Sequence, residues 1–171
     1  MADLQPELTG DTIALRPTAA DDWDGLYAVA SDPLVWAVHP AHVRWQEPVF
    51  RTYFDEALAS GGSMTILDRT TGKIIGASRY STERAGPGAV EIGWTFLARS
   101  RWGGATNREL KTLMLSHAFR WFDLVIFVVG EDNIRSRRAM EKIGGVLLTE
   151  VQERIMADEI TTHVVYEIRK P

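Results

Sequence analysis

The stretch that decides the fold is residues 89–122, AVEIGWTFL-ARSRWGG-ATNRELKTLMLSHAFRWF. Its first nine residues alternate between apolar and other side chains, which predicts a strand with one buried face. That face is predicted to carry Val90, Ile92, Trp94 and Phe96, with Glu91, Gly93 and Thr95 on the other. Residues 105–122 repeat apolar side chains at helical spacing, which predicts a long helix. Its predicted buried stripe consists of Leu110, Leu113, Met114, Ala118 and Trp121.

Outward from this stretch, periodicity and turn residues predict six more strands, at 12–16, 64–67, 74–80, 124–129, 146–154 and 162–169. They also predict three more helices, one from Thr18 or Asp21 to residue 30, one over 47–58 and one over 134–143. Asn133 is expected to cap the last helix. The order β-α-α-β-β-β-α-β-α-β-β is that of an α/β (α+β) fold with a central mixed sheet. The continuous apolar run at 124–129 predicts a buried strand with parallel pairing.

Composition narrows the function classes. A chain of 171 residues, 45% hydrophobic and 25% charged, fits one domain over residues 1–171. Its net charge of −4 offers no excess of cations for nucleic acid. There is no cysteine, so a reducing cytoplasm is the simplest compartment. With no signal peptide and no apolar run near the ~20 residues of a membrane span, we expect a cytoplasmic protein that binds neither membrane nor nucleic acid.

Common catalytic signatures are incomplete in this chain, including the P-loop, the dinucleotide fingerprint and the nucleophile elbow. His39 and His42 are separated by Pro40, and no carboxylate follows at ligand spacing, so we expect no metal site. His117 falls on the apolar stripe of the long helix and is expected to be a core histidine.

The loop at 99–106, RSRWGGAT, combines two arginines, two adjacent glycines and a helix start. Amides at a helix start have no partner inside the helix, and the helix dipole makes this end positive. Glycines allow a phosphate to approach the backbone closely. The loop therefore predicts a pyrophosphate site, although Gly-Gly before a helix can also be a plain turn.

Two motifs give this chain its likeness to a known family. One is VEIGW at 90–94 followed by WGGATNRELK at 102–111, and the other is Asn133-x-x-Ser136 followed by EK-x-G at 141–144. On these motifs the chain resembles the Gcn5-related N-acetyltransferase (GNAT) superfamily, in particular its ribosomal-protein N-terminal acetyltransferase branch. The resemblance covers nearly the whole chain. It implies a mixed, mostly antiparallel seven-stranded sheet flanked by about four helices.

The resemblance implies acetyl-CoA as co-substrate and no metal. The pantetheine arm would lie along the strand end, and a backbone N–H near Thr95 or Phe96 would polarise the thioester. The pyrophosphate would meet the amides of residues 101–106. The implied cofactor-binding residues are Trp94, Thr95, Phe96, Arg101, Trp102, Gly103, Gly104, Ala105, Thr106, Asn133 and Arg138.

Some of these assignments have alternatives. The family's loop pattern, Gln/Arg-x-x-Gly-x-Gly/Ala, fits best with Gly103 and Ala105 at its last two positions, which puts Ser100 at the first. A register on Arg101 and Gly104 also fits, with Thr106 at the last position. Arg138 either meets the extra phosphate of the nucleotide or belongs to a solvated helix face.

The predicted catalytic residues are Glu91 and Ser136. Glu91 is the candidate general base, acting through water, and the alternative is a structural glutamate paired with a cation. The family's usual acid is a tyrosine seven residues after the asparagine, and that position is Met140 here. Ser136 is the substitute acid, and its alternative role is to help cap the helix.

The predicted function is transfer of an acetyl group to a primary amine, either a protein N-terminus or a small molecule such as an amino acid, a polyamine or an antibiotic. The acceptor is expected to meet residues 34–46 and 154–161. A catalytically inactive acyl-CoA-binding module, or a domain without a CoA site, are the alternatives. Six tryptophans and apolar edge strands predict a homodimer, unless all six tryptophans are core residues.

Overall fold

The computed structural model describes all residues, 1–171. Its strands are β1 (Leu8–Thr9), β2 (Ile13–Pro17), β3 (Ser63–Asp68), β4 (Ile74–Ser81), β5 (Ala89–Leu97), β6 (Leu124–Gly130), β7 (Val146–Met156) and β8 (Glu159–Arg169). Its α-helices are α1 (Trp23–Ala30), α2 (Glu47–Ala59), α3 (Thr106–Ala118) and α4 (Ile134–Lys142). None of these helices has the length and apolar character needed to cross a membrane.

All strands belong to one mixed sheet in the order β1-β2-β3-β4-β5-β6-β8-β7. Only β5 and β6 pair in parallel, as the apolar run at 124–129 predicted. The sheet has eight strands instead of the predicted seven, because Leu8 and Thr9 pair with β2. A two-residue strand has no periodicity to reveal it in the sequence.

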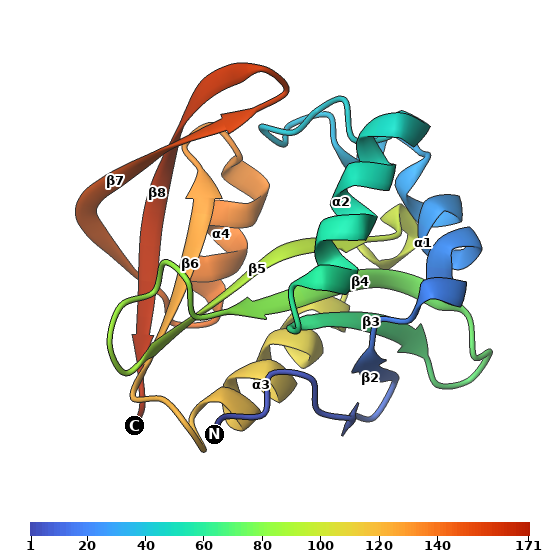
Figure 1. Cartoon of the computed structure of the whole chain (residues 1–171). Helices are drawn as coiled ribbons and strands as arrows, with labels where there is room; N and C mark the ends of the chain where they lie inside the picture. Colours follow the sequence, from blue (N-terminus) through green and yellow to red (C-terminus); the bar gives the residue numbers. More distant parts are fainter.

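Helices cover both faces of the sheet. Figure 1 shows α1 and α2 together on one side and α3 on the opposite side. The larger core lies on the α3 side and includes Leu110 and Met114 of α3 and Met140 of α4. The smaller core lies under α1 and α2 and is rich in aromatic rings, among them Trp36 and Phe50.

Strand β5 contains a bulge that the predicted alternation missed. Trp94 has φ of 53°, and the pairing with β4 shifts between Ala77 and Arg79. Val90 and Ile92 belong to the larger core, whereas Trp94 and Phe96 pack with the smaller core on the other face. The prediction of one shared face is therefore wrong beyond Ile92, because an extra residue in a strand reverses every side chain after it.

Strands β5 and β6 separate after a short pairing. They pair at three positions, the last of which is Glu91 with Ile126. Residues 92–97 of β5 and 127–130 of β6 continue as strand without pairing to each other. We refer to the space between these segments as the β5–β6 gap.

Two other predicted features differ in the structure. Helix α3 ends at Ala118 and not at residue 122, and Trp121 is 46% exposed instead of lying on the buried stripe. The predicted connection at 154–161 is mostly strand, since β7 and β8 meet in a tight hairpin at Ala157 and Asp158, both with positive φ.

Candidate functional site

A cavity of about 950 Å³ occupies the β5–β6 gap. At one end, the loop end, it is bounded by Gly103, Gly104 and the start of α3. At the other, the Glu91 end, it is bounded by residues of β5, β7, β8 and the loop before α2. Twelve predicted site residues line it: Glu91, Trp94, Thr95, Phe96, Arg101, Trp102, Gly103, Gly104, Ala105, Asn133, Ser136 and Arg138. Thr106 is the exception, since it is buried and does not line the cavity.

The loop end presents a run of free backbone amides. Helix α3 has Ala105 at its N-cap without a side-chain cap. The amides of residues 103–108 donate no hydrogen bond within the chain. Gly103 has φ of 73°, a conformation that favours glycine, and a Cβ at Gly104 would meet no atom within 4 Å. Free amides at the positive end of a helix form an anion-binding site.

The free amides begin two residues later than predicted. The amides of Arg101 and Trp102 donate to Ala98 and Arg99 in a 3-10 turn. The Arg101 guanidinium pairs with Asp68, and the Trp102 indole donates to the Leu97 carbonyl at 3.0 Å. Arg101 and Trp102 therefore shape the loop through their side chains, because their amides are already bonded.

Helix α4 supplies one wall of the cavity. Asn133 caps it as predicted, and its Oδ1 accepts from the Ser136 amide at 3.3 Å. Arg138 faces the cavity, whereas Arg137 turns away to Tyr166 and the Glu131 carbonyl. Helix α4 is thus more than a solvated face, because two of its three arginines reach the site.

The third arginine of this helix, Arg135, also lines the cavity, with its guanidinium 3.5 Å from the centre of the Trp102 ring. Met140 stands where the family has tyrosine, and its side chain is part of the larger core. Ser136, the acid predicted from the sequence, lines the cavity from α4.

Glu91 lies at the opposite end of the cavity and is ion-paired. Its side chain is 2% exposed and that of Arg154 9% exposed, and Arg154 Nη2 donates to both carboxylate oxygens at 3.2 and 3.3 Å. The pairing with a cation, which was the structural alternative, is therefore present. The same carboxylate also lines the cavity, so both roles are compatible with its position.

Lys111 is a cavity residue that the sequence reasoning missed. It is 3% exposed, and its Nζ donates to Thr95 Oγ1 at 2.9 Å and lies 5.6 Å from the Phe127 ring. No carboxylate pairs with it, and burial lowers its pKa to about 7. Its position three residues before Met114, on the buried stripe, was a signal that could have revealed it.

Two histidines, His39 and His163, also line the Glu91 end. Burial, with a contribution from Arg44, lowers the pKa of His39 to about 3, and His39 Nδ1 accepts from the Ala41 amide at 2.9 Å. Burial also lowers the pKa of His163, which is 2% exposed. Both imidazoles are therefore neutral near pH 7. His117 is a core histidine, as predicted, and lies 2.7 Å from the Asp3 carbonyl oxygen.

No group of three or more histidine, aspartate or glutamate side chains is placed to hold a metal ion. Two features define the class of this protein. One is the helix start with free amides at one end of the cavity, and the other is the set of buried titratable groups along the cavity. It is an α/β domain with a cavity between two diverging parallel strands, and one end of that cavity suits an anionic group.

The family follows from comparison with known sequences. The acetyltransferase (GNAT) domain family matches residues 12–146, most of the chain. The protein therefore belongs to the GNAT family and is an N-acetyltransferase, in a family that uses acetyl-CoA. No curated protein sequence matches the chain.

Solved structures show the same fold. A GCN5-related N-acetyltransferase from Brucella melitensis has a TM-score of 0.82 at 18% identity, over 96% of this chain and 79% of that one. An acetyltransferase (GNAT family) from Bacillus anthracis has a TM-score of 0.79 at 18% identity, over 96% of this chain and 98% of that one. Mycobacterium smegmatis RimJ in complex with CoA-disulfide has a TM-score of 0.76 at 17% identity, over 99% of this chain and 90% of that one. This agrees with the expected GNAT fold.

Proposed function

We propose that this protein transfers the acetyl group of acetyl-CoA to a primary amine, and that the β5–β6 gap is the site of transfer. The observation that carries this proposal is the run of unbonded amides at 103–108, which opens onto the gap. These amides fit a pyrophosphate, and Arg108, Arg138 and Lys142 surround the same end with positive charge. Acetyl-CoA supplies the acetyl thioester.

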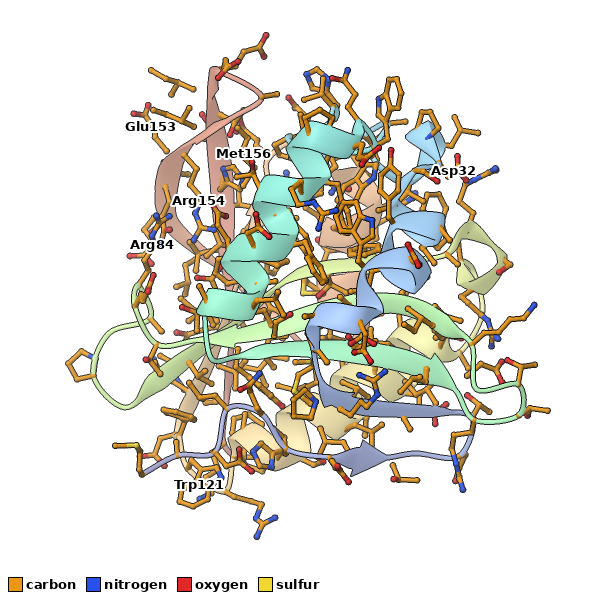
Figure 2. The ribbon with its side chains drawn as sticks, turned by 45° about the vertical axis from the view of Figure 1, so that its right-hand side comes forward. Asp32, Arg84, Trp121, Glu153, Arg154 and Met156 are labelled. Atoms are coloured by element: carbon orange, nitrogen blue, oxygen red, sulfur yellow. The ribbon has the colours of Figure 1, made fainter.

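The residues of the gap have separate proposed roles. The backbone of Thr95 or Phe96 orients and polarises the thioester carbonyl, and Asn133 holds the pantetheine arm or a water molecule. The proposed acceptor segments, 34–46 and 154–161, supply His39, Arg44, Arg154 and Met156 to the Glu91 end of the cavity. In Figure 2, Arg154 and Met156 lie on the inner side of the β7–β8 hairpin, toward α2, and Glu153 lies on the outer side.

Three side chains of the cavity, Glu91, Ser136 and Lys111, are candidates for roles in proton transfer. We propose that Glu91 accepts the proton of the incoming ammonium through water, while Arg154 fixes the direction of the carboxylate. Ser136, on α4, remains the proposed donor of a proton to the thiolate of the leaving CoA. Lys111 is a second group on the cavity wall that can exchange a proton near pH 7, because its pKa is about 7.

Two measurements test the function. Acetyl-CoA at 100 times its Kd should stabilise the protein by about 2.7 kcal/mol, and a domain without a CoA site would show no stabilisation. Release of free CoA thiol with a panel of amines, including peptides, amino acids and polyamines, should then identify a transferase. Stabilisation without thiol release from any amine would instead indicate the inactive acyl-CoA-binding module.

A homodimer is also proposed, with β7 as its contact. Strand β7 is an unpaired edge of the sheet. Val151, Ile155 and Ile160, on the outer side of the β7–β8 hairpin, are 58%, 77% and 73% exposed. The tryptophans no longer support this proposal, because only Trp45 and Trp121 are markedly exposed. A second copy covering this apolar surface would remove it from water.

A further inference from the structure

An unusual group of arginines lies at and beside the Glu91 end of the cavity. The side chains of Arg44 and Arg154 line the cavity, and Arg79 lies behind Trp94. The guanidinium of Arg79 is 4.6 Å from the Trp94 ring and 5.6 Å from the Tyr53 ring, and that of Arg44 is 4.9 Å from Tyr53. Tyr53 therefore joins Arg44 to Arg79, and the Trp94 ring, 6.0 Å from the guanidinium of Arg154, joins Arg79 to Arg154. We call these three residues the arginine cluster.

The arginine cluster carries more positive charge than its surroundings neutralise. Arg154 pairs with Glu91, but neither Arg44 nor Arg79 takes part in any of the five ion pairs of the protein. Glu56 and Glu83 are the other carboxylates that act on Arg79, and both are exposed and unpaired with it. Three arginines and one carboxylate leave a net charge of about +2 at this place.

Unused hydrogen-bond donors are concentrated in the same cluster. The only buried side-chain nitrogen or oxygen atoms in the protein without a hydrogen-bond partner are Nε and Nη2 of Arg79 and Nε of Arg154. Aromatic rings attract a guanidinium through their faces but accept no in-plane N–H bond. Buried donors without partners are costly. Of these three atoms, only Arg154 Nε belongs to a residue that lines the cavity, so this donor indicates a missing acceptor there.

The cofactor does not account for these donors. Glu91, which contacts Arg154, is six residues before Leu97, or about 20 Å along an extended strand. The proposed phosphate site begins only after Leu97, and it has its own cations in Arg108, Arg138 and Lys142. The positive charge of Arg44 and the free donor of Arg154 are therefore not used by the phosphates and face the part of the cavity proposed for the amine acceptor.

We infer that the acceptor is an amine that also carries a carboxylate, and that Arg44 and Arg154 bind this carboxylate. The inference rests on the proposed function and specifies its substrate. A guanidinium presents a planar fork of N–H groups that matches a carboxylate. Glu91 beside Arg154 places a negative group next to the cations, which is complementary to an ammonium and a carboxylate on one small molecule or one peptide end. Polyamines carry only positive charge, so the arginine cluster repels them and excludes them as acceptors.

The test uses pairs of acceptors that differ only in the carboxylate. One arm compares free amino acids with their carboxamides, and the other compares peptide amides that begin with aspartate or glutamate with those that begin with asparagine or glutamine. In at least one arm, the acceptor with the carboxylate should have a kcat/KM about 10- to 100-fold higher than its uncharged partner. This factor corresponds to the free energy of one charge-assisted hydrogen bond. The arm that responds identifies whether the carboxylate is the α-carboxylate or a side chain.

Variants at Arg44 connect the preference to the cluster. Arg44→Met should raise KM for the carboxylate acceptor about 10-fold or more with little change in kcat, and Arg44→Lys should restore part of the affinity. Lys73→Met, on the distant β3–β4 turn, is the matched control and should change neither value. Equal use of both members of every pair, or a polyamine as the best acceptor, would overturn the inference.

Binding of a reaction product separates this inference from the proposed function. N-acetyl amino acids should bind to the CoA-loaded protein, and their carboxamides should bind at least 10-fold more weakly in calorimetry. If these carboxylates bind but no amine releases thiol, the carboxylate site stands and the transferase function fails. If thiol is released but neither carboxylate products nor carboxylate acceptors are favoured, the function stands and the carboxylate inference fails.

Discussion

At the scale of single residues, Gly104 offers the cleanest test of the proposed phosphate site. Its φ is not in the left-handed region and a Cβ there meets no atom, so Gly104→Val should leave the fold intact. The added side chain should project where the ligand approaches the free amides and weaken acetyl-CoA binding at least 10-fold. Calorimetry measures the affinity, and thermal unfolding without ligand checks the fold. Unchanged affinity would place the pyrophosphate elsewhere.

Lys111 gives a prediction about stability and pH. Its pKa is about 7 in the folded protein and 10.5 for an ordinary lysine, so between these pH values the unfolded chain binds a proton that the folded protein lacks. Stability therefore rises with pH over this window, and the cost of burying the charge is greatest below pH 7. Lys111→Met should be more stable than the wild type at pH 6, by on the order of a few kcal/mol.

The difference should shrink as the pH rises from 7 toward 10.5, and it should vanish above 10.5, where lysine is neutral in both states. Chemical denaturation at several pH values measures it. Lys73→Met, which removes an exposed lysine, should show no comparable pH-dependent difference. A gain in stability for Lys111→Met that is the same at every pH would show that the variant acts through packing and not through charge.

Glu91 is predicted to move a proton. Glu91→Gln keeps the shape of the side chain but cannot accept the proton, so kcat should fall about 10²- to 10⁴-fold while the Kd for acetyl-CoA changes only a few-fold. The pH–rate profile should also lose the limb that reports this base. Breaking the pair with Arg154 will lower stability, so assays belong well below the melting temperature of the variant.

Glu153→Gln is the matched control, since Glu153 is exposed next to Arg154 and points outward (Figure 2). It should leave both kcat and the pH profile unchanged. Near-normal turnover by Glu91→Gln would make Glu91 a structural residue, and catalysis would then depend on orientation and backbone polarisation alone.

At the scale of elements, the β7–β8 hairpin is predicted to hold two copies together. Light scattering should give twice the 19.1 kDa chain mass at tens of micromolar. Ile155→Lys places a charge on the exposed apolar surface and should shift the protein to one chain mass. Leu58→Lys, at an exposed apolar site on α2, should leave the mass doubled. A wild type that scatters as a single chain would refute the dimer.

At the scale of the whole molecule, the two parts of the sheet are joined weakly at its centre. Strands β5 and β6 pair at only three positions, and the cavity lies beyond these positions. Figure 1 shows the two strands diverging. A ligand in the gap would supply backbone partners that the strands lack. Acetyl-CoA should therefore slow amide hydrogen exchange in residues 92–97 and 127–130 by at least 10-fold.

Strands β2 and β3, distant from the gap, serve as the internal reference and should show a much smaller change. The Gly104→Val variant, at the same ligand concentration, should show little slowing. If exchange slows equally across the whole sheet, the ligand stabilises the molecule without inserting between these strands.

The sequence by itself determined the elements and the loop end of the site. Apolar periodicity predicted all four α-helices and seven of the eight strands, because local spacing reports which face is buried. The glycines and the helix start at 103–106 predicted an anion site, because both properties belong to a short stretch of backbone.

Only the tertiary structure decided the face reversal at Trp94 and the composition of the Glu91 end. A strand with a bulge and one without it have the same alternation, and only the pairing with β4 distinguishes them. Arg154 meets Glu91 across 63 residues, and Arg44 and Arg79 meet through Tyr53. Such contacts depend on how distant segments pack, and no local spacing encodes them; the burial of Lys111, which lowers its pKa to about 7, arises in the same way.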